Sequence, residues 1–355
     1  VDNIEPTAQV PYDYKGLYVE ELSEVINMEA IKAAGPKTLV DTLGGSGASY
    51  WKAIKERYGL DLTIIHDEYD PTFSFMTYDH DGKVRMDCSS PYVMESVINR
   101  IGDFDLAVGN DPDYDRYGIV ISSGLVSANS FLTMAARYLF TTRGWKNKGI
   151  GKTVVCTTMI DKWAAGVEIP VFEVPVGFKY FSQLLFDGVI GIGGEESAGA
   201  SFLKKDGTVW TTDKDGIIMA LLGMEIMAVM GKSALKMADD FAENYGEPRF
   251  GRIDAPCKKE QKQILKQLSA ELITATSVDG DPITGIRTTS MYNNMPIDGV
   301  RVETDKGWFV ARPSGTEDLY KIYGESYKGD LGLVALLTAG EEIVNAALNG
   351  KIDAE

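Results

Sequence analysis

The sequence predicts consecutive α/β domains, in which mixed sheets are sandwiched by helices, followed by a smaller C-terminal α+β domain. The first observation is that short apolar runs alternate with helix-like stretches through the first two thirds of the chain, the pattern of βαβ units. The second is a change of pattern after the turn at Gly246-Glu247-Pro248, where short strands and two helices follow. The third is a length of 355 residues, enough for two or three domains.

The first predicted domain covers residues 1–122. Its apolar spacing over residues 18–34 is typical of a helix, which ends near Gly35-Pro36. A strand, a glycine-rich turn and a second helix then form the opening of a βαβ unit. The expected elements of this domain are helices over 18–34, 48–58 and 92–101 and strands over 38–40, 62–65 and 104–108.

The glycine-rich turn is Gly44-Gly45-Ser46-Gly47, a composition found in dinucleotide-binding loops. The G-x-G-x-x-G pattern fails, however, because Gly45 and Gly47 are followed by Tyr50 where a third small residue is required. We therefore interpret this segment as a plain strand-to-helix turn.

The central motif of the first domain is the acidic loop of residues 109–118, which follows its last strand. Asp111, Asp113 and Asp115 stand at alternate positions, so their side chains share one side of an extended segment. Carboxylate oxygens are the ligands that hard divalent cations prefer, and open α/β sheets bind ligands at the C-terminal ends of their strands. The loop therefore predicts a divalent-metal site, and the alternative is a solvated acidic turn.

An EF-hand loop begins in the same way as this acidic segment. It needs Gly at its sixth position and a bidentate Glu at its twelfth. The chain has Arg116 and Ser122 at those positions, so the EF-hand interpretation fails.

The second predicted domain covers residues 123–247 and repeats the α/β pattern, and the third, an α+β domain, covers 248–355. The expected elements of the second domain are a helix over 130–140, strands over 153–156, 172–174 and 189–192, and an apolar helix, capped by Asp213, that runs to about residue 230. Those of the third are short strands near Arg252, Val300 and Trp308 and helices over 259–268 and 331–348.

Two loops of the second domain carry polar side chains beside glycines. Glu195 can accept hydrogen bonds from two neighbouring hydroxyls of a sugar, and Ser197 can donate or accept one. Lys179 lies two residues after Gly177 in a partly apolar setting, where an ammonium group can anchor an oxyanion or act as a general acid. The alternatives are an acidic surface loop and a solvated surface lysine.

The third domain contains a candidate phosphate loop at residues 312–317. Arg312 offers a planar fork that can bind a phosphate bidentately, Ser314 and Thr316 add hydroxyl donors, and Gly315 lets the backbone approach closely. The alternative is a β-turn with a surface arginine.

The amino-acid composition argues against two classes of binding partner, nucleic acids and membranes. The chain has 35 Lys and Arg against 52 Asp and Glu, a formal charge of −17, which repels polyanions and argues against nucleic acid. We find neither a secretory signal nor an apolar run of bilayer length, and expect no membrane partner. Cys88, Cys156 and Cys257 are far apart and lack zinc-type spacing, which favours free thiols and a cytoplasmic location.

The loops at residues 111–116, 194–197 and 312–317 occur in this order on successive predicted domains. Together they resemble the α-D-phosphohexomutase superfamily, and the resemblance covers essentially the whole chain. Within that superfamily, the resemblance is closer to the bacterial, glucose-specific phosphoglucomutase branch. The further segments that are similar to that branch are residues 40–45, 86–91, 174–181 and 209–216.

The resemblance implies reversible conversion of glucose 1-phosphate and glucose 6-phosphate, with Mg²⁺ as cofactor and glucose 1,6-bisphosphate as activator and intermediate. It makes Asp111, Asp113 and Asp115 the Mg²⁺ ligands. It also implies that Arg116 steadies this loop and the active-site phosphate, and that Lys179 assists proton transfer or substrate binding. The residues implied to bind the hexose phosphate are Glu195 and Ser197 at the sugar hydroxyls and Arg312, Ser314, Gly315 and Thr316 at the non-reacting phosphate.

One departure from the family pattern is large. The family's phosphoryl donor is a phosphoserine in a Ser-His-Asn-Pro stretch on an N-terminal domain. Neither His66 nor His80, which we interpret as surface side chains, follows a serine. We therefore expect the last three of four domains, without the N-terminal catalytic domain, and a chain that is inactive alone.

Two alternatives to a glucose-specific mutase remain. One is a related phosphomannomutase or phosphoglucosamine mutase. The other is a non-catalytic protein that binds sugar phosphates or metal.

Overall fold

The computed structural model describes residues 12–79, 82–231, 241 and 243–350. It divides into two compact units, which are described separately. Unit 1 comprises Val1–Leu125 and Ile217–Gly231, and unit 2 comprises Val126–Gly216 and Lys232–Glu355. The three domain ranges expected from the sequence remain a prediction.

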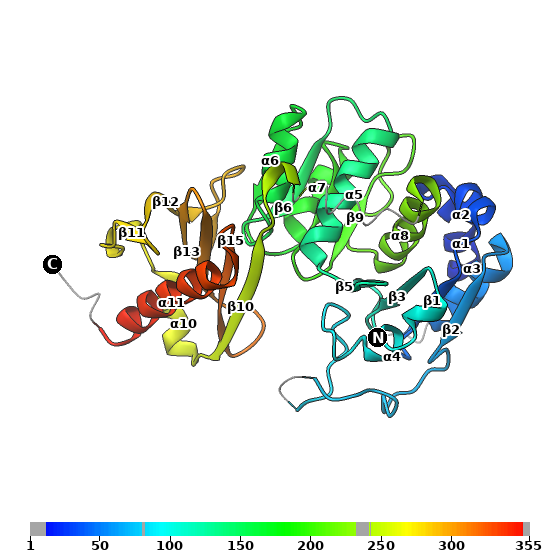
Figure 1. The fold of residues 1–355 in the computed structure, drawn as a ribbon, viewed down its shortest axis with the longest axis horizontal. Helices are drawn as coiled ribbons and strands as arrows, with labels where there is room; N and C mark the ends of the chain where they lie inside the picture. The colour runs from blue at the N-terminus through cyan, green and yellow to red at the C-terminus, as the bar shows by residue number, and fades with distance from the viewer. Residues whose placement is uncertain (1–11, 80–81, 232–240, 242, 351–355) are drawn as a thin grey trace, which may run out of the picture. The chain divides into compact units, whose positions relative to one another are not determined.

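Unit 1 is built on a five-stranded mixed sheet with the order β2-β1-β3-β4-β5 (Figure 1). The central strand β1 (Thr38–Asp41) runs parallel to β2 (Leu62–Ile65) and to β3 (Leu106–Asn110), and β4 (Tyr117–Ile121) runs antiparallel to β3. The carboxyl ends of β1, β2 and β3 therefore lie at one edge of the sheet. The other elements are β5 (Gly124–Val126), α1 (Tyr14–Val25), α2 (Met28–Ala34), α3 (Ala48–Tyr58), α4 (Glu95–Ile98), a 3-10 turn (Ile101–Asp103) and α8 (Gly216–Met230).

The helix predicted over residues 18–34 is two helices, α1 and α2. Asn27 separates them because its side chain accepts a hydrogen bond from the Ala30 N–H and caps α2. The Asn27 N–H in turn donates to the buried Glu225 carboxylate of α8, at 2.7 Å. A residue 198 positions away thus fixes the break, which local periodicity could not reveal.

The helix predicted over residues 92–101 is also shorter, and forms only the single turn of α4. The Arg100 N–H donates to Val97 O, an i to i−3 hydrogen bond that tightens the chain into a 3-10 turn. The short helix still packs on the core of this unit, which includes Leu39, Val97 and Val120.

His66, predicted to be a surface side chain, is partly exposed and has two partners. Its Nδ1 lies 2.8 Å from the Asp41 carboxylate, and its ring stacks on Phe75 at 4.2 Å. His80 lies outside the described residues.

Unit 2 contains two sheets. The first has the order β7-β6-β8-β9, with β6 (Gly149–Thr153) parallel to β7 (Val171–Val174) and β8 (Ile190–Gly194), and with β9 (Ala200–Phe202) antiparallel to β8. Its helices are α5 (Ala128–Thr142), α6 (Met159–Gly166) and α7 (Lys179–Phe186).

Two predictions for this sheet and the helix after it are wrong. The strand placed at 153–156 ends at Thr153, because the Cys156 N–H bonds back to Thr153 O in a turn. Val154 and Val155 are apolar because they pack on the second sheet of unit 2, not because they extend β6. Asp213 is not the cap of α8, which begins at Gly216; its carboxylate accepts from the Lys214 N–H instead.

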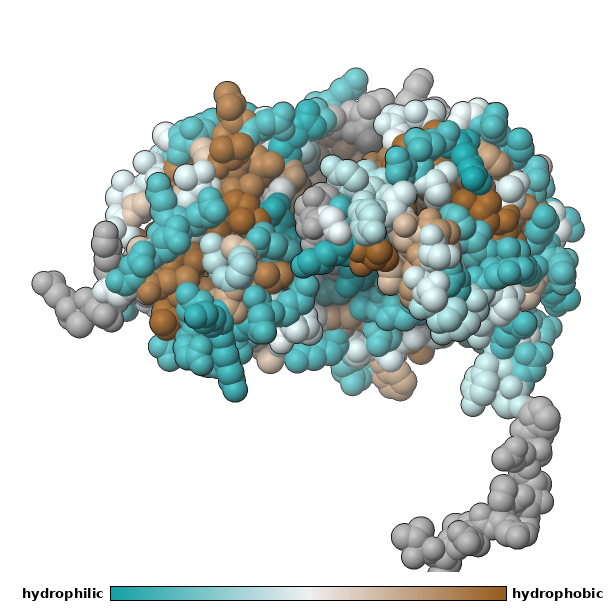
Figure 2. All heavy atoms as spheres, turned by 90° about the horizontal axis from the view of Figure 1, so that it is seen from below, coloured by the Kyte–Doolittle hydropathy of each residue, from teal (hydrophilic) through white to brown (hydrophobic). Residues whose placement is uncertain are grey.

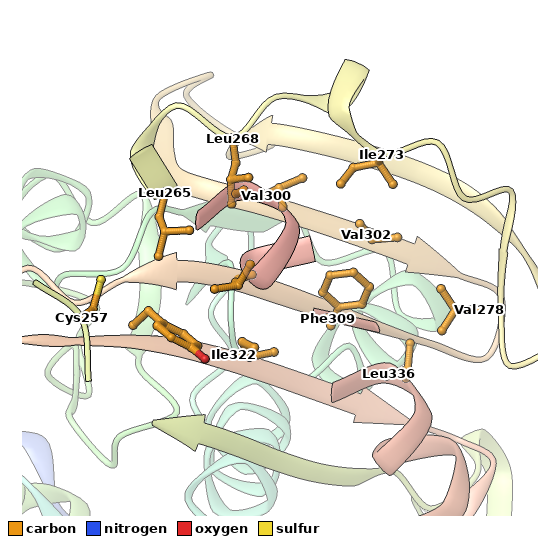
Figure 3. Packing of buried hydrophobic residues seen from close by; sticks show 14 residues of the cluster. Cys257, Leu265, Leu268, Ile273, Val278, Val300, Val302, Phe309, Ile322 and Leu336 are labelled. Carbon is orange, nitrogen blue, oxygen red and sulfur yellow. The ribbon is translucent and has the colours of Figure 1, made fainter. Parts of the chain in front are cut away.

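The second sheet of unit 2 has six antiparallel strands in the order β10-β15-β14-β13-β12-β11. One face packs against helices, and Figure 3 shows the buried cluster there, with Phe309, Ile322 and Leu336 among its members. The elements are β10 (Arg249–Pro256), α10 (Lys259–Lys266), a 3-10 turn (Ala270–Leu272), β11 (Ser277–Val278), β12 (Asp281–Thr289), β13 (Pro296–Thr304), β14 (Gly307–Pro313), β15 (Leu319–Ser326) and α11 (Gly329–Leu348).

Helix α11 is, by length and composition, apolar enough to cross a membrane, a property that the sequence analysis did not recognise. In the structure one face of it, with Leu336, Gly340 and Val344, is buried against the sheet. Leu331 and Val334 remain exposed. Figure 2 shows apolar side chains among hydrophilic ones on the left of the molecule, the side on which Figure 1 draws this sheet.

Candidate functional site

The acidic loop joins β3 to β4 in unit 1 and is clamped at both ends. Asn110 accepts a hydrogen bond from Trp51 Nε1 at 3.0 Å and donates one to Arg116 O at 2.9 Å. Asp111 Oδ1 accepts from the Arg116 N–H at 2.8 Å, which closes the loop on itself. The loop is thus ordered by the fold around it.

The three predicted metal ligands come together in this loop. One carboxylate oxygen from each of Asp111, Asp113 and Asp115 lies within 4.8 Å of the others. Burial, a hydrogen bond with Asp113 and the Asp115 charge raise the pKa of Asp111 to about 7. A cation would relieve this repulsion, and a set of carboxylate oxygens fits a hard divalent ion such as Mg²⁺.

Arg116 offers only partial compensation for these charges. Its Nε lies 3.8 Å from Asp115 and 4.0 Å from Asp111, and its Nη1 lies 4.0 Å from Asp87. Asp87 is not among the site residues expected from the sequence. Its loop precedes α4 and meets Arg116 only in the fold, and no local spacing signals that contact.

The glycine-rich turn after β1 packs directly on the acidic loop. The Ser46 N–H and Oγ both donate to Pro112 O, at 2.9 and 3.0 Å. A Cβ added at Gly45 would lie 2.6 Å from Pro112, and one at Gly47 would lie 2.3 Å from the Tyr114 ring. These glycines are therefore required for close approach of the acidic loop, a role that we missed when we treated the segment as a plain turn.

The candidate sugar loop connects β8 and β9 in unit 2. The Glu195 N–H donates to Gly199 O at 2.8 Å, which closes a tight turn with Ser197 inside it. The buried Glu195 carboxylate accepts from the Gly177 N–H at 3.1 Å. Gly177 has φ +130°, and it lies just before Lys179, the exposed first residue of α7. The structure thus joins the two predicted loops of the second domain.

The candidate phosphate loop joins β14 and β15. The Ser314 N–H donates to Leu319 O at 2.8 Å, and Ser314 Oγ accepts from the Glu317 N–H at 3.2 Å. Arg312 is partly buried at the start of the loop, whereas Gly315 and Thr316 are exposed. A Cβ at Gly315 would meet no atom within 4 Å, so the tip of the loop is open.

The candidate sugar loop and the candidate phosphate loop are linked electrostatically, because the charges of Arg252 and Arg312 act on Glu196. Glu196 and Arg252 are not among the site residues expected from the sequence. Burial raises the pKa of the Glu196 carboxyl, and the charges of Arg252 and Arg312 oppose that effect. Arg252 stands opposite Tyr323 in the sheet, and Tyr323 stands opposite Val310, two residues before Arg312. The two arginines therefore lie on the same face.

Three family models match this chain. Residues 17–124 match the phosphoglucomutase/phosphomannomutase α/β/α domain II, residues 127–245 match α/β/α domain III, and residues 254–331 match the C-terminal domain. The chain belongs to the phosphoglucomutase/phosphomannomutase family. The predicted resemblance and fold class are confirmed, and each of the three loops falls within a different matched domain.

Relatives in this family are longer than the chain. It is 46% identical over 338 residues to the phosphoglucomutase of Komagataeibacter xylinus, a match that covers 94% of this chain and 61% of that protein. It is 24% identical over 344 residues to phosphoglucomutase 1 of Saccharomyces cerevisiae, covering 88% of this chain and 57% of the yeast protein. The chain thus spans less than two thirds of the length of either relative.

Solved structures in the family share the fold. The open form of the Paramecium phosphoglucomutase parafusin superposes with a TM-score of 0.70 at 19% identity, covering 96% of this chain and 63% of that one. The N-acetylphosphoglucosamine mutase of Aspergillus fumigatus, solved with GlcNAc-6P and magnesium, gives a TM-score of 0.60 at 16% identity, with coverages of 96% and 67%.

Proposed function

We propose that this chain carries the metal-, sugar- and phosphate-binding parts of a phosphoglucomutase, which converts glucose 1-phosphate and glucose 6-phosphate through glucose 1,6-bisphosphate. The observation that carries the proposal is that Glu196, in the same loop as Glu195, is close enough to Arg252 and Arg312 in unit 2 for their charges to act on its carboxyl group. The 46% identity to the Komagataeibacter xylinus enzyme supports glucose as the sugar.

The two loops of unit 2 bind different parts of the hexose phosphate. Arg312 binds the non-reacting phosphate bidentately, and Ser314, Thr316 and the open backbone at Gly315 complete its hydrogen bonds. Glu195 and Ser197 bind the sugar hydroxyls. Because the bisphosphate must present each end in turn, this pair has to accept two sugar orientations.

The remaining residues act on the phosphoryl group that is transferred. Asp111, Asp113 and Asp115 hold Mg²⁺, which neutralises charge on the phosphoryl group when it is bound. Arg116 keeps the acidic loop in shape. Lys179 donates a proton to, or neutralises, an oxygen of the substrate.

The 355 residues contain no serine followed directly by a histidine, as the family's Ser-His-Asn-Pro stretch requires. The phosphoryl donor is therefore proposed to be a phosphoserine on the family's N-terminal domain. The chain alone then binds hexose phosphate but does not turn it over. The three free, buried cysteines support the proposed cytoplasmic location.

A coupled assay and a calorimetric titration test this function. With glucose 1-phosphate, Mg²⁺ and added bisphosphate we expect no turnover, and robust activity would refute the proposed need for another domain. Glucose 6-phosphate should bind the chain and lose most of its affinity in Arg312→Ala. Equal heats from both proteins would refute the phosphate loop.

The sugar specificity needs its own comparison, because the chain is also 24% identical over 255 residues to the phosphoglucosamine mutase of Methanocaldococcus jannaschii. We expect glucose 6-phosphate to bind more tightly than mannose 6-phosphate or glucosamine 6-phosphate. The reverse order would move the function to a related mutase.

A further inference from the structure

Tyr114 lies between two of the candidate metal ligands, Asp113 and Asp115, and its backbone has a left-handed conformation with φ +64°. A residue with a Cβ adopts this conformation only at a cost in free energy, which glycine does not incur. Such strain persists only where the surrounding structure holds the residue in place. The acidic loop therefore has a strained residue among its three aspartates.

The acidic loop is folded, and not extended as we expected from the alternation of its aspartates. The Tyr114 N–H donates to Asp111 O at 3.0 Å, and the Arg116 N–H donates to Asp111 Oδ1 at 2.8 Å. In an extended segment the Cα atoms of Asp111 and Asp115 would lie about 13 Å apart, too far for their carboxylates to meet. In the folded loop one carboxylate oxygen of each aspartate lies within 4.8 Å of the others. The left-handed turn at Tyr114 is thus part of what brings the three carboxylates together.

Two contacts hold the Tyr114 side chain against the turn that follows β1. Its hydroxyl donates to Thr42 O at 3.1 Å. Its ring lies against Gly47, where an added Cβ would be 2.3 Å from a ring carbon. Tyr114 is 8% exposed, so an aromatic ring beside a candidate ion site is almost wholly removed from water. Burial of the ring and the hydrogen bond together offset the strain in the backbone.

The acceptor of that hydrogen bond is itself fixed to the sheet. The Thr42 N–H donates to Ile65 O, at the end of β2, at 3.3 Å. The Thr42 hydroxyl donates to His66 O, and Thr42 is fully buried. Tyr114 therefore ties the acidic loop to the carboxyl ends of two central strands of unit 1.

We propose that Tyr114 is a positioning residue, which holds the three aspartates in place for a divalent cation by anchoring their loop to the sheet. The identity of the ion rests on the function proposed above; the anchoring of the loop does not. Because the loop is already ordered, the ion does not have to order the carboxylates when it binds, and its affinity is higher. Glycine would adopt the same backbone without strain, but it has no side chain that could serve as the anchor.

Three substitutions at this position separate the anchor from the strain, with calorimetric titration of the full chain with magnesium chloride as the measurement. Tyr114→Ala loses the ring and keeps a Cβ at the left-handed position, so it should bind Mg²⁺ about tenfold more weakly. Tyr114→Gly loses the ring and also the strain, so it should bind about threefold more tightly than Tyr114→Ala. Tyr114→Phe loses only the donor to Thr42 O and should bind about threefold more weakly than the unmodified chain.

A merely structural role predicts a different order. If Tyr114 only filled space, the loss of affinity would follow the volume removed, and Tyr114→Gly would bind Mg²⁺ no more tightly than Tyr114→Ala. That order, or an unchanged affinity in Tyr114→Ala, would overturn the proposal. If neither of these variants folds, Tyr114→Phe decides, and an unchanged affinity in Tyr114→Phe would overturn the proposal in the same way.

Hydrogen exchange gives a readout without the ion. The amides of Arg116 and Ser46 donate to Asp111 Oδ1 and to Pro112 O. Without Mg²⁺ both amides should exchange at least about tenfold faster in Tyr114→Ala, and unchanged rates would contradict the anchoring. The control is Tyr69→Ala, which removes a tyrosine that is 73% exposed in the same unit and should change neither the rates nor the affinity.

The two proposals fail in different ways. If Mg²⁺ does not bind the unmodified chain but exchange at Arg116 accelerates in Tyr114→Ala, the proposed metal site is wrong and Tyr114 still anchors the loop. If Mg²⁺ binds in an Asp113-dependent way and all Tyr114 variants bind it equally well, Tyr114 is not a positioning residue.

Discussion

Charged side chains gather in the acidic loop of unit 1 and at the junction of the two sheets of unit 2. We call the second group, Glu173, Arg287, Glu303 and Arg301, the charge array. The two groups differ in how closely each carboxylate is paired with an arginine. In the acidic loop Arg116 Nε lies 4.0 Å from Asp111 and 3.8 Å from Asp115, and the pKa of Asp111 rises to about 7. In the array burial alone would raise the pKa of Glu173, but hydrogen bonds from Arg287 and the charges of Lys152 and Arg301 hold it below its usual value. The charges of the array join parts of the fold, whereas the clustered carboxylates of the acidic loop are where we propose that a cation binds.

The largest expected effect comes from unbalancing the array. Arg301→Met removes the donor to Glu303 and Val154 O and leaves a partly buried carboxylate with one partner fewer. Breaking a buried pair in this way should lower the free energy of unfolding by about 3–5 kcal/mol. Urea denaturation followed by circular dichroism measures it.

The control for that experiment is Arg249→Met, which breaks the exposed ion pairs of Arg249 with Glu247 and Asp330. It should cost less than about 1 kcal/mol. A loss of similar size in both variants would show that burial and balance are not what distinguishes the array.

A smaller effect is expected from the glycine turn under the acidic loop. A Cβ at Gly47 would lie 2.3 Å from the Tyr114 ring, so Gly47→Ala should cost about 1–3 kcal/mol of stability and weaken Mg²⁺ binding. Gly102→Ala, where a Cβ meets nothing within 4 Å, is the matched control. Equal melting temperatures for the two variants would argue against close packing at this turn.

Removing one negative charge from the acidic loop should weaken metal binding without destabilising the fold. Asp113→Asn should bind Mg²⁺ at least about tenfold more weakly, a loss of roughly 1.4 kcal/mol, while its metal-free melting temperature stays the same or rises. Titration calorimetry with magnesium chloride measures the affinity, with the exposed Asp103→Asn as control. If Mg²⁺ binds both variants alike, the ion lies elsewhere.

The smallest effect is a pH dependence of the array. The pKa of Glu173 is lowered from 4.5 in the folded chain, so its contribution to stability is complete above about pH 4.5 and is lost as the pH falls through the folded value. The melting temperatures of the unmodified chain and Glu173→Gln should therefore differ most near neutral pH and converge in acid. A difference that grows on acidification would have the wrong sign.

The sequence revealed the parts of the site that are contiguous. Asp111, Asp113 and Asp115 come together because they are alternate residues of one loop, and the candidate phosphate loop is likewise a single segment. Strand-to-helix patterns such as β1 and α3 were also predictable, since their apolar spacing is local.

What the sequence could not reveal depends on long-range pairing. Arg252 comes near the phosphate loop only because β10 pairs with β15, a register that no local pattern encodes. Val154 was predicted to be in a strand because it is apolar. Its side chain is apolar because it packs against the second sheet of unit 2. The break at Asn27 depends on Glu225 in the same way.

The most direct test of the account is hydrogen exchange on the full chain with each ligand in turn. We predict that Mg²⁺ alone protects the amides of residues 110–117, and that glucose 6-phosphate alone protects those of 194–199 and 312–319. Protection of both unit 2 segments by one ligand would support a shared sugar-phosphate site. Protection of only one of them, or of neither, would contradict it.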